Sequence, residues 1–217
     1  MIVDERVSCY IKSLTACNSN FLEELREKAL EDKVPIIKRE TESLLKTLLL
    51  LKKPKRILEV GAAVAYSSLV MAETLEGNVK ISTIENYEKR VLEARKNIAD
   101  SHYSNIIHLI EEDASKVLKE LVEKEEKYDF IFMDAAKGQY INWLEPVIKL
   151  LNKEGVLCSD NVLQGGDIVQ SRYLIERRDR SIHSRLREYL YELTHREELS
   201  TTILSLGDGV ALTVLKK

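Results

Sequence analysis

Two short polar segments of this chain carry side chains suited to catalysis: Asp134-Ala135-Ala136-Lys137 and Ser159-Asp160-Asn161. Each directly follows an apolar run, residues 128–133 and 155–158, with the composition of a buried strand. Parallel strands deliver the residues that follow them to the carboxyl edge of a sheet, where open α/β folds bind ligands. The two segments are therefore expected to meet on one rim.

The chemistry of these side chains is that of a metal-assisted reaction with a general base. Asp134, Asp160 and Asn161 offer hard oxygen ligands of the kind that Mg²⁺ prefers. Lys137 can act as the base if a nearby cation and partial burial favour its neutral form. Two simpler interpretations remain open: Asp160-Asn161 as the cap of a following helix, and Lys137 as a solvated surface lysine.

The elements that must position these side chains alternate between strands and helices after Pro54. Expected strands cover residues 56–60, 79–84, 106–110, 128–133 and 155–158, with expected helices at 66–75, around 91–98, at 114–122 and at 141–151. This alternation predicts βαβ units and a parallel sheet. Runs 200–206 and 210–215 flank Gly207-Asp208-Gly209, so an antiparallel hairpin is expected to close the sheet.

Helical periodicity dominates both ends of the chain. Three apolar stripes predict amino-terminal helices: Val7, Tyr10, Ile11 and Leu14; Leu22, Leu25 and Ala29, with Asn20 as N-cap; and Leu44, Leu45, Leu48 and Leu49. A long basic helix is expected over about 168–193, with an apolar stripe of Ile182, Leu186, Leu190 and Leu193 and with His183 and Arg187 facing outward. We expect one domain, with a helical cap (1–53) and an α/β core (54–217).

A second group of residues suits an adenosine-containing cofactor. Gly61 ends the first strand, Glu85 ends the second at the position that binds ribose hydroxyls in dinucleotide folds, and Asp113-Ala114 follow the third. The loop 61–65 has one glycine instead of G-x-G-x-x-G, which disfavours NAD and FAD and favours a cofactor without phosphate, such as S-adenosylmethionine. A simple tight turn remains the alternative for Gly61, and a surface acid for Glu85.

Composition excludes several classes of protein. The chain has 217 residues, 44% of them hydrophobic, and a net charge of -3, which argues against coating nucleic acid through overall charge. Three cysteines without C-x-x-C spacing indicate a reducing cytoplasm and no disulfide or zinc framework. No run approaches the length of a membrane helix, so no membrane partner is expected. The four histidines show no ligand spacing and are expected at the surface or in loops.

The motifs in order resemble the cation-dependent O-methyltransferases, the family of the catechol and caffeoyl-CoA enzymes. The residues that carry this resemblance are Leu58-Glu59-Val60-Gly61, Tyr66-Ser67-Ser68, Glu85, Asp113-Ala114, Asp134-Ala135-Ala136-Lys137 with Tyr140, and Asp160-Asn161. Within the family, Val34-Pro35-Ile36-Ile37, Gln139-Tyr140, Asp160-Asn161-Val162-Leu163 and Gly207-Asp208-Gly209-Val210-Ala211 look most like the bacterial tRNA 5-hydroxyuridine methyltransferases. The fold implied is a Rossmann-like methyltransferase sheet, mostly parallel.

The resemblance assigns roles that the residue pattern alone does not. Asp134, Asp160 and Asn161 would hold Mg²⁺ or another divalent cation, with Lys137 and Asp134 at the reacting hydroxyl. Cofactor contacts would come from Ile37, Glu59, Gly61, Ser67, Glu85, Asp113, Ala114 and Asp134. The family usually has glycine where this chain has Ala65, and a methyl group there is expected to narrow the methionine pocket if the backbone needs a positive φ.

The expected substrate is 5-hydroxyuridine at the wobble position of a tRNA anticodon loop, with a homodimer as the expected assembly. A basic segment supplies candidate RNA contacts, since arginine binds phosphate and stacks on bases: Arg172, Arg177, Arg178, Arg180 and Arg187. An ion-paired helix or a dimer interface is the alternative for this segment. A catechol-like or caffeoyl-CoA-like acceptor remains open, as does an RNA-binding protein without turnover.

Overall fold

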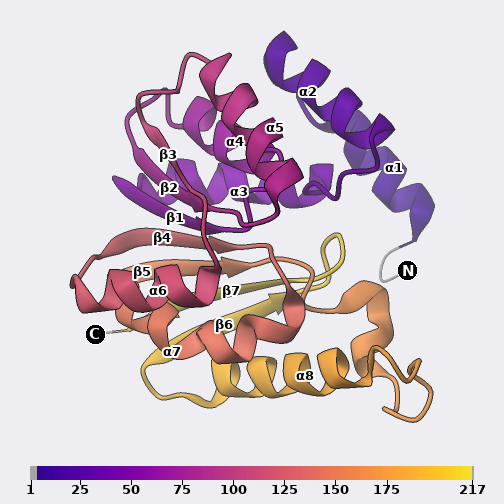
Figure 1. Cartoon of the computed structure of the whole chain (residues 1–217). Helices are drawn as coiled ribbons and strands as arrows, with labels where there is room; N and C mark the ends of the chain where they lie inside the picture. Colours follow the sequence, from indigo (N-terminus) through magenta and orange to yellow (C-terminus); the bar gives the residue numbers. More distant parts are fainter. Residues whose placement is uncertain (1–3, 217) are drawn as a thin grey trace.

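The computed structural model describes residues 4–216, and it is built on one seven-stranded sheet (Figure 1). The strand order is β3-β2-β1-β4-β5-β7-β6, parallel from β3 to β5 and antiparallel for β7 and β6. The strands are β1 (Arg56–Val60), β2 (Lys80–Ile84), β3 (Ile107–Ile110), β4 (Tyr128–Met133), β5 (Leu151–Ser159), β6 (Leu199–Leu204) and β7 (Val210–Leu215). The predicted α/β class and the carboxyl-terminal hairpin are confirmed.

Helices cover both faces of this sheet (Figure 1). They are α1 (Glu5–Leu14), α2 (Asn20–Glu31), α3 (Arg39–Lys52), α4 (Tyr66–Thr74), α5 (Glu88–Ala99), α6 (Ala114–Glu123), α7 (Tyr140–Leu150) and α8 (Arg180–His195). One buried cluster joins α2 to α5 with the sheet, and a second joins α6, α7 and α8 with the opposite face. Within residues 4–216, no helix is long and apolar enough to span a bilayer.

The amino-terminal helices form as predicted, but their apolar stripes differ in burial. The stripes of α2 and α3 face the core, with Leu25 and Leu45 among their buried residues. The stripe of α1 lies at the surface, with Val7, Tyr10, Ile11 and Leu14 between 40% and 67% exposed. The N-cap of α2 is Ser19 and not Asn20, which is the first helical residue.

The long basic helix was predicted wrongly at its start. Helix α8 begins at Arg180, twelve residues after Ile168, because residues 164–179 form a short 3-10 helix, η2 (Gln164–Val169), and turns. Gly165 and Gly166 within η2 have φ of 63° and 106°, which interrupts any helix there.

The outward orientation predicted for His183 is also wrong, because it lies in α8 with only 2% of its surface exposed. The buried face of α8 passes through His183, Leu186, Tyr189 and Leu193, so it is rotated from the stripe expected at Ile182. Arg187 faces outward as predicted, and His102, His108 and His195 are exposed.

Candidate active site

A cavity of about 860 Å³ opens at the carboxyl ends of the parallel strands. Its walls come from the segment before α3, the loops after β1 to β5 and the turn between β6 and β7. Eight of the predicted site residues line it together: Gly61, Glu85, Asp113, Ala114, Asp134, Lys137, Asp160 and Asn161. Residues 100 positions apart therefore meet on one rim, as expected from a parallel sheet.

The sheet ladder continues for one residue beyond each strand, and this places the polar side chains. The amide of Asp134 donates to the carbonyl of Val60 (3.0 Å), and the amide of Asp160 donates to that of Met133 (2.9 Å). The amide of Glu85 likewise donates to Ile110 (3.1 Å). Each acidic residue is thus fixed by its neighbouring strand, and its side chain projects from a rigid base.

Asp134, Asp160 and Asn161 form a compact group. Asn161 has a left-handed backbone (φ 60°), a conformation that asparagine tolerates better than most residues. Its Nδ2 donates to Oδ1 of Asp134 (2.9 Å), and its backbone amide donates to Oδ1 of Asp160 (2.8 Å). The amide oxygen of Asn161 takes part in neither bond, so the group keeps three oxygen-bearing side chains around one point.

The positive charge of Lys137 offsets the two buried carboxylates only in part. Burial raises the pKa of Asp160 to about 7, and the nearby charge of Asp134 raises it further. Burial also raises the pKa of Asp134, against the opposing charge of Lys137. Asp160 is only 3% exposed. A bound cation would relieve this excess of negative charge.

The donor set fits a hard divalent cation. The candidate ligand group consists of two carboxylates and one amide. Among residues 4–216 there is no cluster of three His, Cys, Asp or Glu side chains that could hold a metal ion. Mg²⁺ is commonly held by one or two carboxylates and completes its shell with water and substrate oxygens. An incomplete protein shell is what a substrate-binding metal site requires.

The turn between β6 and β7 supports this group, which the sequence did not reveal. The amides of Val162 and Leu163 donate to the carbonyls of Gly209 (2.9 Å) and Asp208 (3.0 Å). Gly209 has φ of 92°, and a Cβ there would lie 2.3 Å from Cγ of Leu163. Asp208 and Lys38 both line the cavity, and Nζ of Lys38 pairs with Oδ1 of Asp208 at 2.7 Å. The G-D-G motif predicted a hairpin and contributed to the family resemblance, but it placed neither Asp208 nor Lys38 in the site.

Tyr140 ties together the loops after β4 and β5. Its buried hydroxyl accepts a hydrogen bond from the amide of Ala135 (3.2 Å) and can donate to the carbonyl of Met133 (3.1 Å) or Asp160 (3.3 Å). Lys137 begins the short 3-10 helix η1 (Lys137–Gln139) directly before Tyr140. The loop that carries Lys137 is therefore anchored at both ends.

The half of the cavity where the cofactor is predicted to bind is formed around Gly61. This residue has φ of 102°, and a Cβ on it would lie 2.1 Å from the carbonyl oxygen of Asp134. Only glycine fits here. Glu85 accepts hydrogen bonds from the amides of Ala63 (2.9 Å) and Tyr87 (2.9 Å), which orients its carboxylate at the cavity wall.

Asp113 has two roles in the structure. It lines the cavity, and it caps α6 by accepting a hydrogen bond from the amide of Ser115 (2.9 Å). Trp143, which sequence reasoning missed, also lines the cavity and donates from Nε1 to Oγ of Ser115 (3.0 Å). This end of the cavity offers an aromatic ring and a polar edge, which suits a flat base.

The other predicted cofactor residues differ in placement. Ile37 and Ser67 line a small recess that adjoins Gly61 and Asp134. Glu59 is fully buried and lines neither space; it accepts hydrogen bonds from the hydroxyls of Ser68 and Thr83. Burial raises the pKa of Glu59. This placement indicates that Glu59 supports the loop after β1 and does not contact a cofactor directly.

Ala65 has the positive φ that was anticipated (63°), but its methyl group packs in the core. It lines neither the cavity nor the recess, so its methyl group does not narrow either space.

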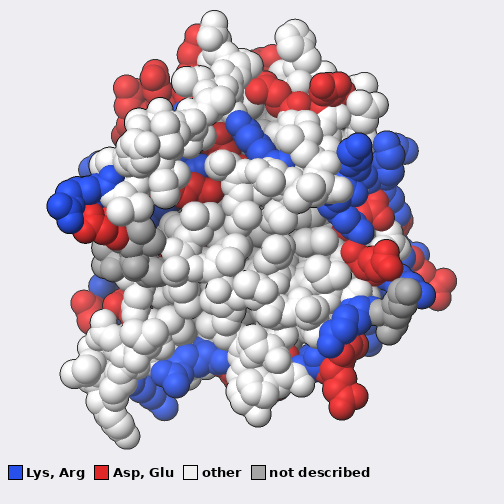
Figure 2. Space-filling model, turned by 180° about the vertical axis from the view of Figure 1, so that it is seen from behind, with Lys and Arg blue, Asp and Glu red and all other residues white. Residues whose placement is uncertain are grey.

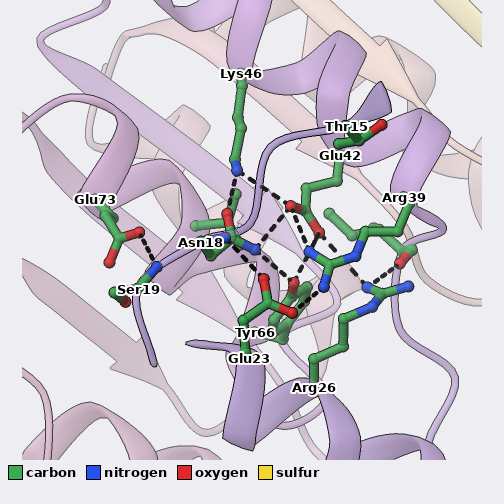
Figure 3. Close-up of polar contacts among 12 residues, drawn as sticks. Thr15, Asn18, Ser19, Glu23, Arg26, Arg39, Glu42, Lys46, Tyr66 and Glu73 are labelled. Carbon is green, nitrogen blue, oxygen red and sulfur yellow. Dashed lines mark hydrogen bonds and ion pairs between the residues drawn. The ribbon is translucent and has the colours of Figure 1, made fainter. Parts of the chain in front are cut away.

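A buried polar network fixes the cofactor side of the cap (Figure 3). Glu42 of α3 accepts hydrogen bonds from Tyr66 (2.7 Å) and Asn18 (2.8 Å), and it pairs with three cations: Arg26 (3.5 Å), Arg39 (3.2 Å) and Lys46 (3.2 Å). Burial raises the pKa of Glu42, but these contacts outweigh it and hold the pKa below its ordinary value.

The same network reaches the cofactor recess. Nη1 of Arg26 donates to the carbonyl of Ile37 (3.1 Å), and Ile37 lines the recess together with Tyr66. One carbonyl lone pair of Ile37 is therefore already engaged by the protein. The network joins the position of the Ile37 segment to the buried charge of Glu42.

The candidate RNA contacts lie outside the cavity and fall into two groups: exposed arginines, and arginines bonded to backbone carbonyls. Arg172, Arg177 and Arg178 are exposed, and Arg178 pairs with Glu176 (3.0 Å). Two others bind backbone carbonyls. Arg180 donates to Ile175 (3.0 Å) and Tyr173 (3.3 Å), and Arg187 donates to Ile168 (3.3 Å).

The fold and cavity define a protein of the methyltransferase class, and comparison with known proteins agrees. Residues 12–217 match the family model described as O-methyltransferase, and the chain belongs to that family. A Vitis vinifera flavonoid 3',5'-methyltransferase is 31% identical over 172 residues, which cover 76% of this chain and 72% of that relative.

Two solved structures superpose along nearly the whole chain. A Staphylococcus aureus protein described as a candidate caffeoyl-CoA O-methyltransferase has a TM-score of 0.88 and 31% identity, over 98% of this chain and 100% of that chain. A Podospora anserina methyltransferase with bound S-adenosylhomocysteine has a TM-score of 0.87 and 25% identity, over 98% of this chain and 95% of that chain.

Proposed function

We propose that this protein transfers the methyl group of S-adenosylmethionine to one of two adjacent oxygens of an acceptor, with the help of a divalent cation such as Mg²⁺. The observation that carries this proposal is the meeting of Asp134, Asp160, Asn161 and Lys137 in one cavity that also contains Glu85. The bound S-adenosylhomocysteine of the Podospora relative supports the choice of cofactor.

Three residues of the cavity would have separate tasks in this reaction. Glu85 would bind the ribose hydroxyls, and Gly61 leaves room for the methionine portion. When bound, the cation lowers the pKa of an acceptor hydroxyl and holds the acceptor in place. Lys137, in its neutral form, would receive the hydroxyl proton at Nζ as the new oxygen–carbon bond forms and the sulfonium–carbon bond breaks. The rigid rim orients the attacking oxygen, which contributes several kcal/mol to the rate.

The names of the relatives favour a small acceptor of the catechol or caffeoyl-CoA type. A flavonoid 3',5'-methyltransferase and a candidate caffeoyl-CoA enzyme are both about one third identical to this chain. Such acceptors present two neighbouring oxygens, which suits a cation held by two carboxylates and one amide.

A specific observation favours a second acceptor, 5-hydroxyuridine at the wobble position of tRNA, giving 5-methoxyuridine. Its 5-hydroxyl and 4-carbonyl are also adjacent oxygens. The exposed arginine segment leads into α8, and α8 contacts the loop of Lys137 through a hydrogen bond from Arg185 to the carbonyl of Gly138 (3.2 Å). An anticodon loop presents both phosphates and an unstacked base to such a surface.

A protein that binds RNA without turnover is disfavoured. The cavity contains both carboxylates, the amide and the lysine. Ala65, whose methyl group was expected to narrow the methionine pocket, does not line it. Methyl transfer with a labelled cofactor distinguishes the enzyme from the binder, and salt-sensitive affinity for tRNA distinguishes RNA from phenol.

Glu85→Gln is expected to weaken S-adenosylmethionine binding about 10- to 100-fold, because a hydrogen bond to a charged carboxylate contributes about 1.5–3 kcal/mol. The dissociation constant measured by calorimetry is the readout. Glu88→Gln provides the matched control, since Glu88 is exposed in the first turn of α5 and does not line the cavity. Equal affinities for wild type and Glu85→Gln would remove Glu85 from the ribose site.

Arg178→Ala is expected to raise the KM for tRNA about two- to fivefold and leave the KM for a phenol unchanged, as for one exposed phosphate contact. Lys119→Ala is the control, because both side chains are 79% exposed and ion-paired, but Lys119 lies on α6. Equal losses on both acceptors would indicate a structural role for Arg178.

We also propose a homodimer. The apolar stripe of α1 is exposed, and Figure 2 shows that the face opposite to that of Figure 1 has a broad centre without charged side chains. Both features suit a contact between two copies. Light scattering on the purified protein tests this: a mass of one chain at micromolar concentration would contradict it.

A further inference from the structure

A second hollow, separate from the cavity described above, lies beside α8. It has a volume of about 310 Å³ and is lined by Arg172, His183, Ser184 and Arg187. Arg187 lies one helical turn after His183 and Ser184 on α8, whereas Arg172 comes from the irregular segment before this helix. In Figure 1 this segment loops out between β5 and α8.

His183 is the feature that demands an explanation. It is 2% exposed, and neither Nδ1 nor Nε2 has a hydrogen-bond partner among the described residues. An unsatisfied buried polar group is costly and is rare in folded proteins. A half-turn of the imidazole about its Cβ–Cγ bond exchanges nitrogen and carbon positions, so the ring edge at the hollow can present an N–H.

The other lining side chains are donors without counter-charge. Arg172 is exposed, and its guanidinium has no hydrogen bond or ion pair among residues 4–216. Arg187 donates one N–H to the carbonyl of Ile168, and its other N–H groups remain available as donors. Ser184 uses its hydroxyl hydrogen on the carbonyl of Arg180, and no acidic side chain lines the hollow. Two guanidinium groups and an imidazole suit an oxyanion with several acceptor atoms.

The elements that form the hollow also frame the acceptor side of the active site. Helix α8 holds the loop of Lys137 through Arg185, and Arg187 holds η2, which follows Asp160-Asn161. Tyr173, next to Arg172, is 84% exposed and offers a ring on which a base can stack. A ligand in the hollow would therefore lie beside a substrate approaching the cavity.

We propose that Arg172, His183 and Arg187 form a binding site for a nucleotide phosphate of the acceptor. That the phosphate belongs to the acceptor rests on the proposed function; the phosphate site itself does not. The same chemistry occurs in an RNA backbone and in the phosphates of a coenzyme A thioester, and experiment distinguishes these two sources.

The test follows the histidine ring signals of the full-length protein by NMR while inorganic phosphate is added. The exposed His102, His108 and His195 serve as internal controls, and replacing each by Gln assigns the remaining signal to His183. We expect a saturable shift of the His183 signal alone. Arg172→Gln should weaken it at least about tenfold, because a charge-assisted contact is lost.

Arg177→Gln is the matched variant, since Arg177 is exposed in the same segment and does not line the hollow. A His183 signal that does not move, four signals that move together, or equal losses in the two variants would overturn the site. Neither variant removes a described contact, so misfolding does not obscure the result.

Competition then identifies the source. If an anticodon stem-loop RNA displaces phosphate at a lower concentration than coenzyme A does, the site is assigned to RNA. If coenzyme A displaces phosphate at the lower concentration, the site is assigned to a thioester. Displacement by neither overturns the link to the acceptor. A shift of His183 without methyl transfer to any acceptor contradicts the proposed function only, whereas transfer without the shift contradicts the phosphate site only.

Discussion

Replacement of Asp160 by alanine is expected to reduce cation-stimulated methyl transfer about 1,000-fold, because a metal ion contributes several kcal/mol to such a reaction. The affinity for S-adenosylmethionine should stay within about threefold of wild type, since the cofactor half of the cavity is intact. Asp160 directly follows β5, beside Asn161, and does not line the recess of Ile37 and Ser67. Initial rates across a Mg²⁺ titration and calorimetry with the cofactor are the two measurements.

The variant should fold normally. Asp160 is a buried carboxylate whose pKa is raised by burial and by Asp134, so its removal relieves an unfavourable interaction, and Tm should not fall. Asp167→Ala is the control, because Asp167 is an exposed acid seven residues further along. Unchanged turnover in Asp160→Ala, or an equal loss in Asp167→Ala, would remove Asp160 from the metal site.

The largest effect on stability is expected from Glu42→Ala. The substitution leaves Arg26, Arg39 and Lys46 without the carboxylate that they share, and breaking such a buried group costs about 3–5 kcal/mol. For a chain of this size each kcal/mol lowers Tm by about 2–4 °C, so we expect a fall of roughly 6–20 °C. Thermal unfolding followed by circular dichroism measures it.

Glu24→Ala on α2 is the matched control, since Glu24 is exposed and belongs to no described ion pair. The cofactor provides a second readout: Arg26 also holds the carbonyl of Ile37, so Glu42→Ala should weaken S-adenosylmethionine binding as well. A Tm within 2 °C of that of Glu24→Ala would show that the network contributes little stability.

The same residue predicts a pH dependence. Because the folded-state pKa of Glu42 lies below its ordinary value of 4.5, the unfolded chain binds the proton more tightly. The stabilisation is complete above that value and is lost as pH falls through the folded-state pKa. Glu42→Gln should therefore show a shallower loss of unfolding free energy below about pH 4.5 than wild type. Parallel curves for the two proteins would contradict this.

The sheet and its rim could be predicted because their causes are local in sequence. Buried parallel strands are apolar runs that end at a polar residue, and the ladder places Glu85, Asp134 and Asp160 at one edge whatever the loops do. Gly61 carried a similar signal, since a strand that runs into glycine indicates a sharp turn.

Other features depend on contacts that no pattern reveals. Asp208 reaches the cavity because Gly209 packs against Leu163, 46 residues earlier. The burial of Glu42 had no signal in the sequence because its partners Asn18, Arg26 and Tyr66 lie on three other segments. The face of α8 was misjudged because His183 and Tyr189 are polar residues that the fold buries.

Methyl transfer from labelled S-adenosylmethionine is the measurement that tests the central claim most directly. The purified protein receives Mg²⁺ and either tRNA containing 5-hydroxyuridine or a simple catechol, each with and without EDTA. We predict label in at least one acceptor, lost on adding EDTA and restored by excess Mg²⁺; label in tRNA at much lower acceptor concentration would favour the RNA substrate. Transfer that EDTA leaves unchanged, or no transfer to either acceptor, would contradict the account.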